Sequence, residues 1–361
     1  MSSDAAVEQA RRVVGLYGDP TISWSIGIQA ELAEPVTPAA LTGRLGAVVA
    51  EFPHFGAAPD VRRIEIEQLG ETTTRFLDEQ YGDRDPLLRV ATTVDSRQLV
   101  VAAHHGAVDG LGLLAVVGRL VDASVGSDSR GIGTRRSSQA FVASSMRRLG
   151  EAVFAPPSRF AAEVTHSASP ATTGDVVCVR HLAVTKADTS LITAAACQAM
   201  RDWNAAHGQP TRRIVVAVGA SRRTAAPTPD RDTAYLRIVV NPPGHAGQIG
   251  ADLASAEPEP DFPVTRGSWN LAPLATRMLR NRLGSSLFVS NLGRLTSRGL
   301  LRRVAFFPAA AGPRAVAVGV ASTEEATTVT VRMSRSSFTD SAAERLCEAI
   351  ADEIERGRAA Q

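Results

Sequence analysis

The chain has 361 residues, with 39 lysines and arginines against 37 aspartates and glutamates, and 44% of the residues are hydrophobic. Only one basic residue is a lysine, Lys186, and no Gly-Lys pair occurs, which excludes a phosphate-binding Walker loop. A pyridoxal Schiff base, usual kinase chemistry or a lysine nucleophile would rest on Lys186, which lies in a polar Thr-Lys-Ala-Asp run, so we set them aside. The length and composition indicate a globular protein with room for two cores.

Three scattered cysteines, Cys178, Cys197 and Cys347, fit reduced thiols better than a disulfide framework. The sequence starts without a basic and apolar secretory signal and contains no apolar run long enough to span a membrane. A net charge of +2 with three tryptophans and three tyrosines gives no indication of nucleic-acid binding. We therefore expect a cytoplasmic protein without a membrane span or a nucleic-acid partner.

The first part of the chain alternates strand and helix patterns. Period-2 alternation predicts a strand over 22–32, and Thr37-Pro38 provides the N-cap and first-turn proline of a helix that stops at Pro53. A short apolar strand over 99–103 runs straight into a turn rich in histidine and glycine, and an apolar helix is predicted over 111–121.

A second round of strands and helices follows a linker. Segments 124–138 and 156–174 are rich in Gly, Ser, Pro, Ala and Thr and flank a short helix, 141–154. Strands are then predicted over 176–184, 214–218, 236–240, 287–289, 315–320 and 327–333, and helices over 188–206, 272–282 and from 340 to 354. We predict an N-terminal lobe (1–155), a crossover linker (156–174) and a C-terminal lobe (175–361), both lobes α/β, with a cleft between them.

Residues 104–110, His-His-Gly-Ala-Val-Asp-Gly, are the most specific feature of the sequence. A strand that ends in a glycine-containing turn can hold an imidazole at a cleft, where it takes up and returns a proton near neutral pH. Because neighbouring strand residues point to opposite faces, His104 and His105 cannot both reach one substrate, so one is catalytic and the other structural. Asp109 would fix the turn through the loop or an arginine, and Gly110 would permit the tight exit into the helix.

The residues of this motif and the helix after it have two alternative interpretations. Histidines at strand ends are usually satisfied structural groups, but the whole seven-residue pattern favours a catalytic site. Gly110-x-Gly112-x-x-Ala115 also fits a dinucleotide-binding fingerprint. We reject that reading because the fingerprint starts at the end of its strand within a βαβ unit, whereas here two histidines intervene and a Gly/Ser linker follows the helix.

With this motif the sequence resembles an acyltransferase superfamily that shares His-His-x-x-x-Asp-Gly: chloramphenicol acetyltransferase, peptide-synthetase condensation domains, and wax-ester and polyketide-associated acyltransferases. The stand-alone condensation-like, wax-ester and polyketide-associated enzymes look nearest. Weaker similarities follow in the same order along most of the chain, at 33–55, 85–89, 216–223 and 290–293. The resemblance implies two chloramphenicol-acetyltransferase-like α/β sandwich lobes with the active site in a tunnel at their interface.

The resemblance also implies roles for the motif. His105 would be the general base that takes the acceptor's proton during attack on a thioester carbonyl, and His104 and Gly110 would be structural. Asp109 would form a structural salt bridge to Arg222, with Arg223 as the alternative, because a partly buried carboxylate needs a paired cation. The donor would be a phosphopantetheine thioester, either acyl-CoA or an acyl carrier protein, with no metal and no further cofactor.

Two further groups of residues are candidates for the site. Ser290 or Asn291 would line the pocket and help the tetrahedral oxyanion, unless they are simply polar residues of a strand-terminal turn. Residues 262–323 contain nine arginines and no acidic residue. From these arginines we predict a positive donor-binding rim, unless they form an ordinary solvated face, and the rim would comprise Arg277, Arg280, Arg302 and Arg303.

The leading functional hypothesis is an acyltransferase of natural-product biosynthesis that moves an acyl group from a carrier-protein or CoA thioester to an alcohol or amine. It would act as a monomer or weak dimer on a small-molecule acceptor, with an acyl or peptidyl carrier protein as a partner. One alternative is a condensation-like domain that serves as a non-catalytic recruitment module. Another is that the same base catalyses an intramolecular cyclisation or a dehydration. The chain is shorter than typical condensation domains, which leaves the donor and acceptor identities open.

Overall fold

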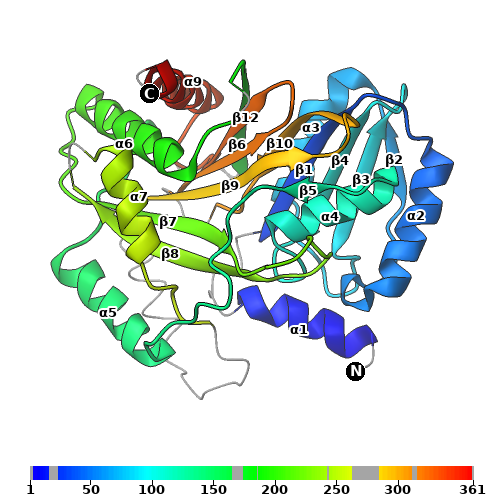
Figure 1. Cartoon of the computed structure of the whole chain (residues 1–361), viewed down its shortest axis with the longest axis horizontal. Coiled ribbons are helices and arrows are strands. Elements are labelled where there is room, and N and C mark those ends of the chain that lie inside the picture. The colour runs from blue at the N-terminus through cyan, green and yellow to red at the C-terminus, as the bar shows by residue number, and fades with distance from the viewer. Residues whose placement is uncertain are drawn as a thin grey trace.

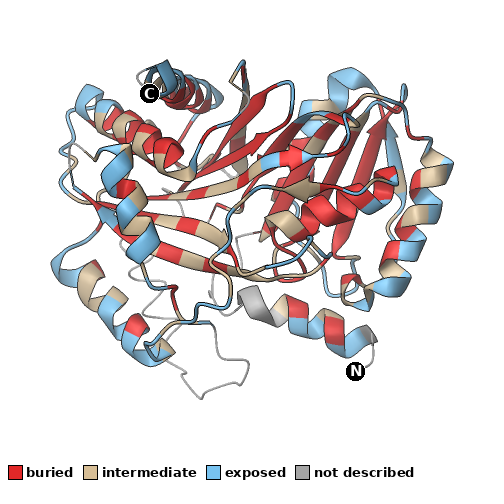
Figure 2. Cartoon of the chain, in the orientation of Figure 1, coloured by how far each residue is buried: buried red, intermediate tan, exposed pale blue. Residues whose placement is uncertain are grey.

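The computed structural model describes residues 3–15, 23–164, 174–184, 186–241, 244–261, 284–310 and 315–359. Within these ranges the strands form two mixed sheets, each covered by helices (Figure 1). Figure 2 shows that the central strands of both sheets are buried. The apolar side chains form two main cores, one for each sheet. The prediction of an α/β protein with two lobes is confirmed.

The first sheet has the order β10-β1-β4-β3-β2. Only β2 and β3 pair in parallel among these strands. Its strands are β1 (Ser25–Leu32), β2 (Val61–Ile64), β3 (Leu88–Thr93), β4 (Gln98–His104) and β10 (Leu301–Phe307). The helices of this part are α1 (Ser3–Gly15), α2 (Pro38–Glu51), α3 (Leu69–Asp78) and α4 (Gly110–Val121), with short 3-10 turns at Pro53–Phe55 and Ile66–Gln68.

The second sheet has the order β6-β12-β11-β9-β7-β8, and the short strand β5 (Gly126–Ser127) pairs with one end of β9. The strands are β6 (Asp175–Leu182), β7 (Ile214–Ser221), β8 (Thr233–Val240), β9 (Leu287–Thr296), β11 (Val316–Ser322) and β12 (Thr327–Ser334). Helices α6 (Thr189–Ala206), α7 (Ala246–Ser255) and α9 (Asp340–Ala359) pack on this sheet, and α5 (Phe141–Phe154) lies near β8 (Figure 1).

The sequence explains where the best-predicted helices begin. Thr37 caps α2, because its hydroxyl oxygen accepts a hydrogen bond from the amide of Ala40, and a proline follows at the first helical position. Leu41, Leu45 and Val48 then lie on one face of α2 and are buried. The predicted helix over 141–154 coincides with α5.

Several elements were not predicted. The segments of α1, α3, β2, α7 and β10 were not assigned a helix or strand, although α1 and α3 carry a helical apolar period that was missed. In α3, for example, Thr72 and Thr73 are buried beside Phe76 although the segment looks polar. The predicted helix over 272–282 lies outside the described residues.

Strand β10 crosses from one half of the sequence to the other. It falls within the range predicted for the C-terminal lobe, yet it pairs antiparallel with β1 at the edge of the first sheet. Sheet membership therefore does not follow the sequence order at 301–307. The lobe boundaries at 155 and 175 stay a prediction. None of the described helices is long and apolar enough to cross a membrane.

Candidate active site

The end of β4 holds the two histidines in different directions. The His104 amide donates to the Leu87 carbonyl at 3.0 Å on one side, and the His105 amide donates to the Trp24 carbonyl at 2.7 Å on the other. Ser25 lies opposite His104 on β1. Trp24 has a φ of 52°, in the left-handed region that bulky residues rarely adopt, so strained backbone lies directly beside the motif.

His104 is packed as a structural residue. Its side chain lies edge-on to the ring of Tyr81, with centroids 5.3 Å apart, and its Nδ1 accepts a hydrogen bond from the Gly106 amide at 3.2 Å. Burial, followed by the nearby charge of His105, lowers the pKa of His104 to about 3. His104 is therefore neutral near pH 7 and uses its acceptor nitrogen to brace the turn.

His105 faces the second sheet. Its Nδ1 lies 3.1 Å from the Val108 carbonyl oxygen, and its Nε2 lies 2.9 Å from the hydroxyl of Tyr235 on β8. A carbonyl only accepts hydrogen bonds, so Nδ1 carries the proton and Nε2 presents its lone pair. The two histidines thus contact different partners, in agreement with the alternation expected at a strand end.

Burial is the main cause that lowers the pKa of His105, to about 4, and the neighbouring Arg231 guanidinium acts in the same direction. The hydrogen bond to Val108 and the charge of Asp109 oppose this shift. The result is a neutral imidazole at physiological pH, whose Nε2 is ready to receive a proton.

Asp109 ties the motif to the second lobe. Its carboxylate is 1% exposed and accepts the amide of Gly112 at 2.8 Å, which caps α4. The same carboxylate accepts three further hydrogen bonds, each at 2.7 Å. They come from Arg223 Nη1, the Asp232 amide and the Thr233 hydroxyl. Donors from β8 and the preceding loop therefore satisfy a carboxylate of the first lobe.

The leading expectation for the partner of Asp109 was wrong. Arg223, the alternative, makes the salt bridge, whereas Arg222 pairs with Asp261 at 2.9 Å. β7 runs as far as Ser221, so the two arginines follow an extended segment and project to opposite sides. Only the second one reaches Asp109.

A glycine is needed at position 110 because there is no room for a side chain, and not because the backbone adopts a special conformation. Its φ is not in the positive range, which corrects the expectation based on a tight exit. A Cβ at this position would lie 2.8 Å from the Phe306 ring and 2.9 Å from Leu292. A Cβ on Gly112 would lie 2.1 Å from the Asp230 carbonyl oxygen. The loop at Asp230 therefore packs directly on Gly112, whose amide is already bonded to Asp109.

Tyr235 stands on the face of the second sheet that meets His105. Gly219 on β7 lies opposite Tyr235, and Ser290 follows in the same row on β9. The Phe288 ring meets the Tyr235 ring at 5.8 Å in an edge-to-face contact. Ser290 therefore lies on the same face as Tyr235, in accordance with the idea that it lines the site, and both residues lie within strands.

Asn291 has a different position. Its side-chain amide donates to the Ala187 carbonyl at 3.1 Å and to Thr189 at 3.3 Å, and its carbonyl oxygen accepts the Gly293 amide at 2.9 Å. These bonds join β9 to the start of α6, so Asn291 is a structural residue and its expected oxyanion role is not supported. Both Ser290 and Asn291 lie inside β9, so the alternative interpretation, two polar residues in a strand-terminal turn, is wrong.

The predicted arginine rim is only partly described. Arg277 and Arg280 lie outside the described residues. Arg302 lies 3.1 Å from Glu325, and Arg303 lies 3.6 Å from Glu31, so both arginines have acidic partners on the surface.

Arg302 and Arg303 are not brought together with His105. Glu31 pairs with Arg303 across β1 and β10, whereas Ser25, at the other end of β1, pairs with His104. Six residues of extended strand correspond to about 20 Å. The rim was predicted at the donor mouth, for the donor's phosphates or an acidic carrier protein and not for the reacting atoms at His105, so Arg302 and Arg303 stay a predicted donor-binding rim.

Sequence reasoning missed Tyr235, although the pattern of β8 carried a signal. Leu236, Ile238 and Val240 are buried in the core of the second lobe. Since strand residues alternate between faces, Tyr235 and Arg237 must face the other way. A tyrosine at the start of such a strand is a candidate for a site between lobes.

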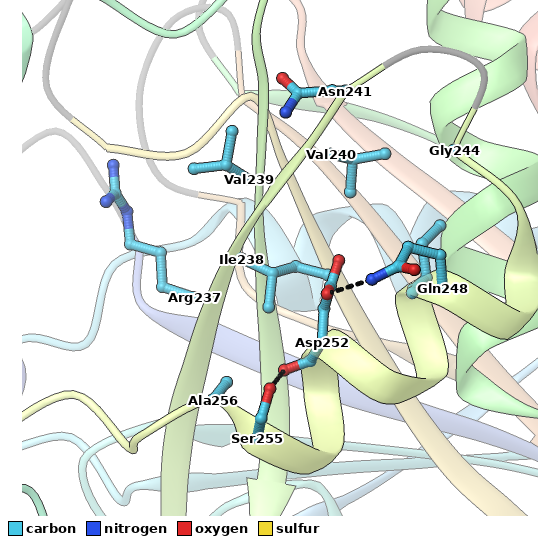
Figure 3. A pocket seen from close by; sticks show the side chains of 11 residues that line it. Arg237, Ile238, Val239, Val240, Asn241, Gly244, Gln248, Asp252, Ser255 and Ala256 are labelled. Carbon is cyan, nitrogen blue, oxygen red and sulfur yellow. Dashed lines mark hydrogen bonds between the residues drawn. The ribbon is translucent and has the colours of Figure 1, made fainter.

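A separate groove of about 580 Å³ lies between β8 and α7 (Figure 3). In Figure 3 the Gln248 side chain donates to Asp252, one turn further along α7, at 2.8 Å. Its lining contains none of the predicted site residues. Arg237, at one end of this groove, is held by Glu151 of α5.

No protein-family model and no curated protein matches the sequence. Solved structures do match. The first condensation domain of the calcium-dependent antibiotic synthetase, in complex with a substrate analogue, is 15% identical with a TM-score of 0.60, over 98% of this chain and 94% of that one. The starter condensation domain of rhizomide synthetase, in complex with C8-CoA and Leu-SNAC, is 13% identical with a TM-score of 0.60, over 97% and 93%.

A third similar structure is the epimerization domain from the third module of tyrocidine synthetase B, which is 15% identical with a TM-score of 0.50, over 94% of this chain and 92% of that one. At these identities the comparison establishes the fold. The chain thus has the two-lobed fold of the condensation domains of these peptide synthetases, the fold that the resemblance of the histidine motif implied.

Proposed function

We propose that this chain is an acyltransferase that moves an acyl group from a CoA or carrier-protein thioester to an alcohol or amine in natural-product biosynthesis. The observation that carries the proposal is the geometry of His105. Val108 fixes its tautomer, and its unprotonated Nε2 faces the second lobe, where it lies 2.9 Å from a hydroxyl group. A hydroxyl at that place is the kind of group from which a general base takes a proton.

In the proposed reaction the acceptor's O–H or N–H donates to His105 Nε2. Nε2 takes the proton as the acceptor attacks the thioester carbonyl, and a tetrahedral intermediate forms. Its collapse breaks the C–S bond, and the imidazolium returns the proton to the departing sulfur. The products are the ester or amide and the free thiol, and no acyl-enzyme is needed because the thioester is already activated.

Asp109 acts in this scheme as a positioning residue. It caps α4 directly after the histidine turn and binds Arg223 and the start of β8, which carries Tyr235. The Asp109 cluster thereby sets the distance between the base and the second lobe. Ser290, on the same face as Tyr235, is the remaining candidate for a donor to the oxyanion.

A second candidate function is a recruitment module without turnover. One structural neighbour, an X-domain with a TM-score of 0.50 and 13% identity over 97% of this chain and 92% of that one, was solved in complex with OxyB of teicoplanin biosynthesis. The half-buried state of His105 is compatible with that use of the fold. Recruitment does not explain why the tautomer of His105 is fixed so that its unprotonated Nε2 faces the second lobe.

The test is product analysis by mass spectrometry with panels of acyl-CoA and acyl-carrier donors and of amine and alcohol acceptors. We expect an acceptor that gains the acyl group, and about 100-fold or more slower turnover in the His105→Ala variant, with an unchanged thermal melt. His104→Ala is the matched comparison, since it removes the other imidazole and is expected to lower stability more. Loss of water without acyl gain would support cyclisation or dehydration. No turnover with any donor would support recruitment.

A further inference from the structure

Among the residues that the structure describes, only Tyr235 forms a side-chain hydrogen bond with His105 Nε2. Its hydroxyl lies 2.9 Å away, and its ring is fixed at the other side by the edge-to-face contact with Phe288. Both Tyr235 and His105 are half-buried. The proposed mechanism has no task for this tyrosine.

The valence of the imidazole limits what can bind there. Nδ1 donates to the Val108 carbonyl, and Nε2 then has a single lone pair in the plane of the ring. The Tyr235 hydroxyl donates into that lone pair. One lone pair accepts one well-aligned donor, so an acceptor O–H or N–H cannot be deprotonated by His105 while Tyr235 keeps its bond.

The same bond affects water. A water molecule that reached Nε2 would be activated against the thioester, and the donor would be hydrolysed without transfer. With Tyr235 in place, Nε2 is already occupied.

We propose that Tyr235 is a gating residue: its hydroxyl holds the place of the acceptor at His105 Nε2 and is displaced when an acceptor hydroxyl or amine binds. This proposal rests on the proposed acyltransferase function and adds a residue that decides what reaches the base. Specificity then follows from competition. An acceptor must form enough contacts to replace the hydrogen bond of Tyr235, and water does not.

The test uses the full chain with the variants Tyr235→Phe and Tyr235→Ala and with Tyr81→Phe as the matched control. Tyr81 is a second half-buried tyrosine, which packs on His104 and whose hydroxyl lies 3.3 Å from Ser25. We expect Tyr235→Phe to keep kcat within about threefold and to lower the acceptor KM, because the competing donor is gone. We expect Tyr235→Ala to raise thioester hydrolysis without acceptor by about tenfold, and Tyr81→Phe to leave both values unchanged.

Three outcomes would overturn the gate. A loss of kcat in Tyr235→Phe as large as that in His105→Ala would make Tyr235 part of the proton path. An acyl adduct on the intact wild-type protein that is absent from Tyr235→Phe would make it a nucleophile. Wild-type values for both KM and hydrolysis in both variants would leave it without a role in access.

A readout that needs no turnover separates this proposal from the function on which it rests. The hydrogen bond from Tyr235 stabilises neutral His105, so its removal in Tyr235→Phe should raise the pKa of His105, as followed by NMR titration of the imidazole. If the wild type turns over no donor and the titration still shifts, the acyltransferase proposal fails while the contact stands. If the titration is unchanged, the contact that defines the gate is absent.

Discussion

Two buried clusters join the two lobes near the histidines, and they are built in opposite ways. In the Asp109 cluster, a carboxylate of the first lobe is surrounded by donors of the second, including Arg223. In the Arg332 cluster, a guanidinium of β12 that is 1% exposed enters the first lobe, where it donates to the carbonyls of Ser25 at 2.6 Å and Leu77 at 2.9 Å.

The difference lies in what compensates each charge. Asp109 meets an opposite charge directly. Arg332 is satisfied mainly by backbone carbonyls, with Asp175 as its one ion-pair partner among the described residues. Asp78 accepts the Asp175 amide at 3.0 Å, and burial, followed by the charge of Asp175, raises the pKa of Asp78 to about 6. Both clusters thus contain a direct ion pair, and the Arg332 cluster also contains a carboxyl group, that of Asp78, whose pKa is raised to about 6.

The largest expected effect comes from breaking the Asp109 cluster. Asp109→Ala leaves Arg223 without its buried partner and removes the cap of α4, so we expect a loss of about 3–5 kcal/mol in the free energy of unfolding. Urea denaturation measures the change. Asp109→Asn, which keeps the shape and can still accept hydrogen bonds, should lose less. A denaturation midpoint of Asp109→Ala equal to that of the wild type would show that the cluster does not hold the lobes.

The Asp78→Asn variant tests the Arg332 cluster, and its side chain keeps an acceptor for the Asp175 amide. Because the pKa of Asp78 is raised in the folded chain, its contribution to stability is fully present below about pH 3.8 and is lost as pH rises through about 6. The variant is therefore expected to be more stable than the wild type at pH 8 by about 1–2 kcal/mol. This gain should disappear toward pH 4.

Unfolding curves at several pH values measure the difference in stability between Asp78→Asn and the wild type. The pKa of His104 is lowered, so it acts with the opposite sign: its contribution is present above about pH 6.5 and is lost as pH falls toward about 3. Because His104 is unchanged in Asp78→Asn, the difference between the variant and the wild type isolates Asp78. A stability difference that does not depend on pH would contradict the raised pKa.

The smallest effect is expected far from both clusters, at Arg303. Its guanidinium is half exposed and lies 3.6 Å from Glu31, so Arg303→Ala should change the free energy of unfolding by less than about 1 kcal/mol. The donor KM of the same variant tests the predicted rim. A rise that weakens with salt would place Arg303 in the donor-binding rim, and an unchanged donor KM would exclude it.

These two clusters also show how far the sequence could be read. The Asp109 cluster was predictable because Asp109 belongs to a recognisable motif and a buried carboxylate needs a cation. The choice between Arg222 and Arg223 was not, since it depends on where β7 ends. Arg332 gave no signal, because one arginine in the pattern of β12 does not reveal that its side chain crosses into the other lobe.

The fold, too, could be predicted from the sequence only in part. Helices α2, α4 and α6 and most core strands follow from local periodicity, so the α/β class was predictable. The pairing of β10 with β1 was not, because a strand pattern does not name its partner. Tyr235 was missed for a related reason: its role depends on a contact between residues 130 positions apart.

The state of His105 is tested most directly by NMR of its imidazole nitrogens in the wild-type chain from pH 8 to pH 4. We expect Nδ1 to carry the proton and Nε2 to be unprotonated at pH 7, with the second protonation only near pH 4. That result would establish a neutral base whose lone pair faces the second lobe. A doubly protonated ring at pH 7, or a proton on Nε2 in place of Nδ1, would contradict the assignment of His105 as the general base.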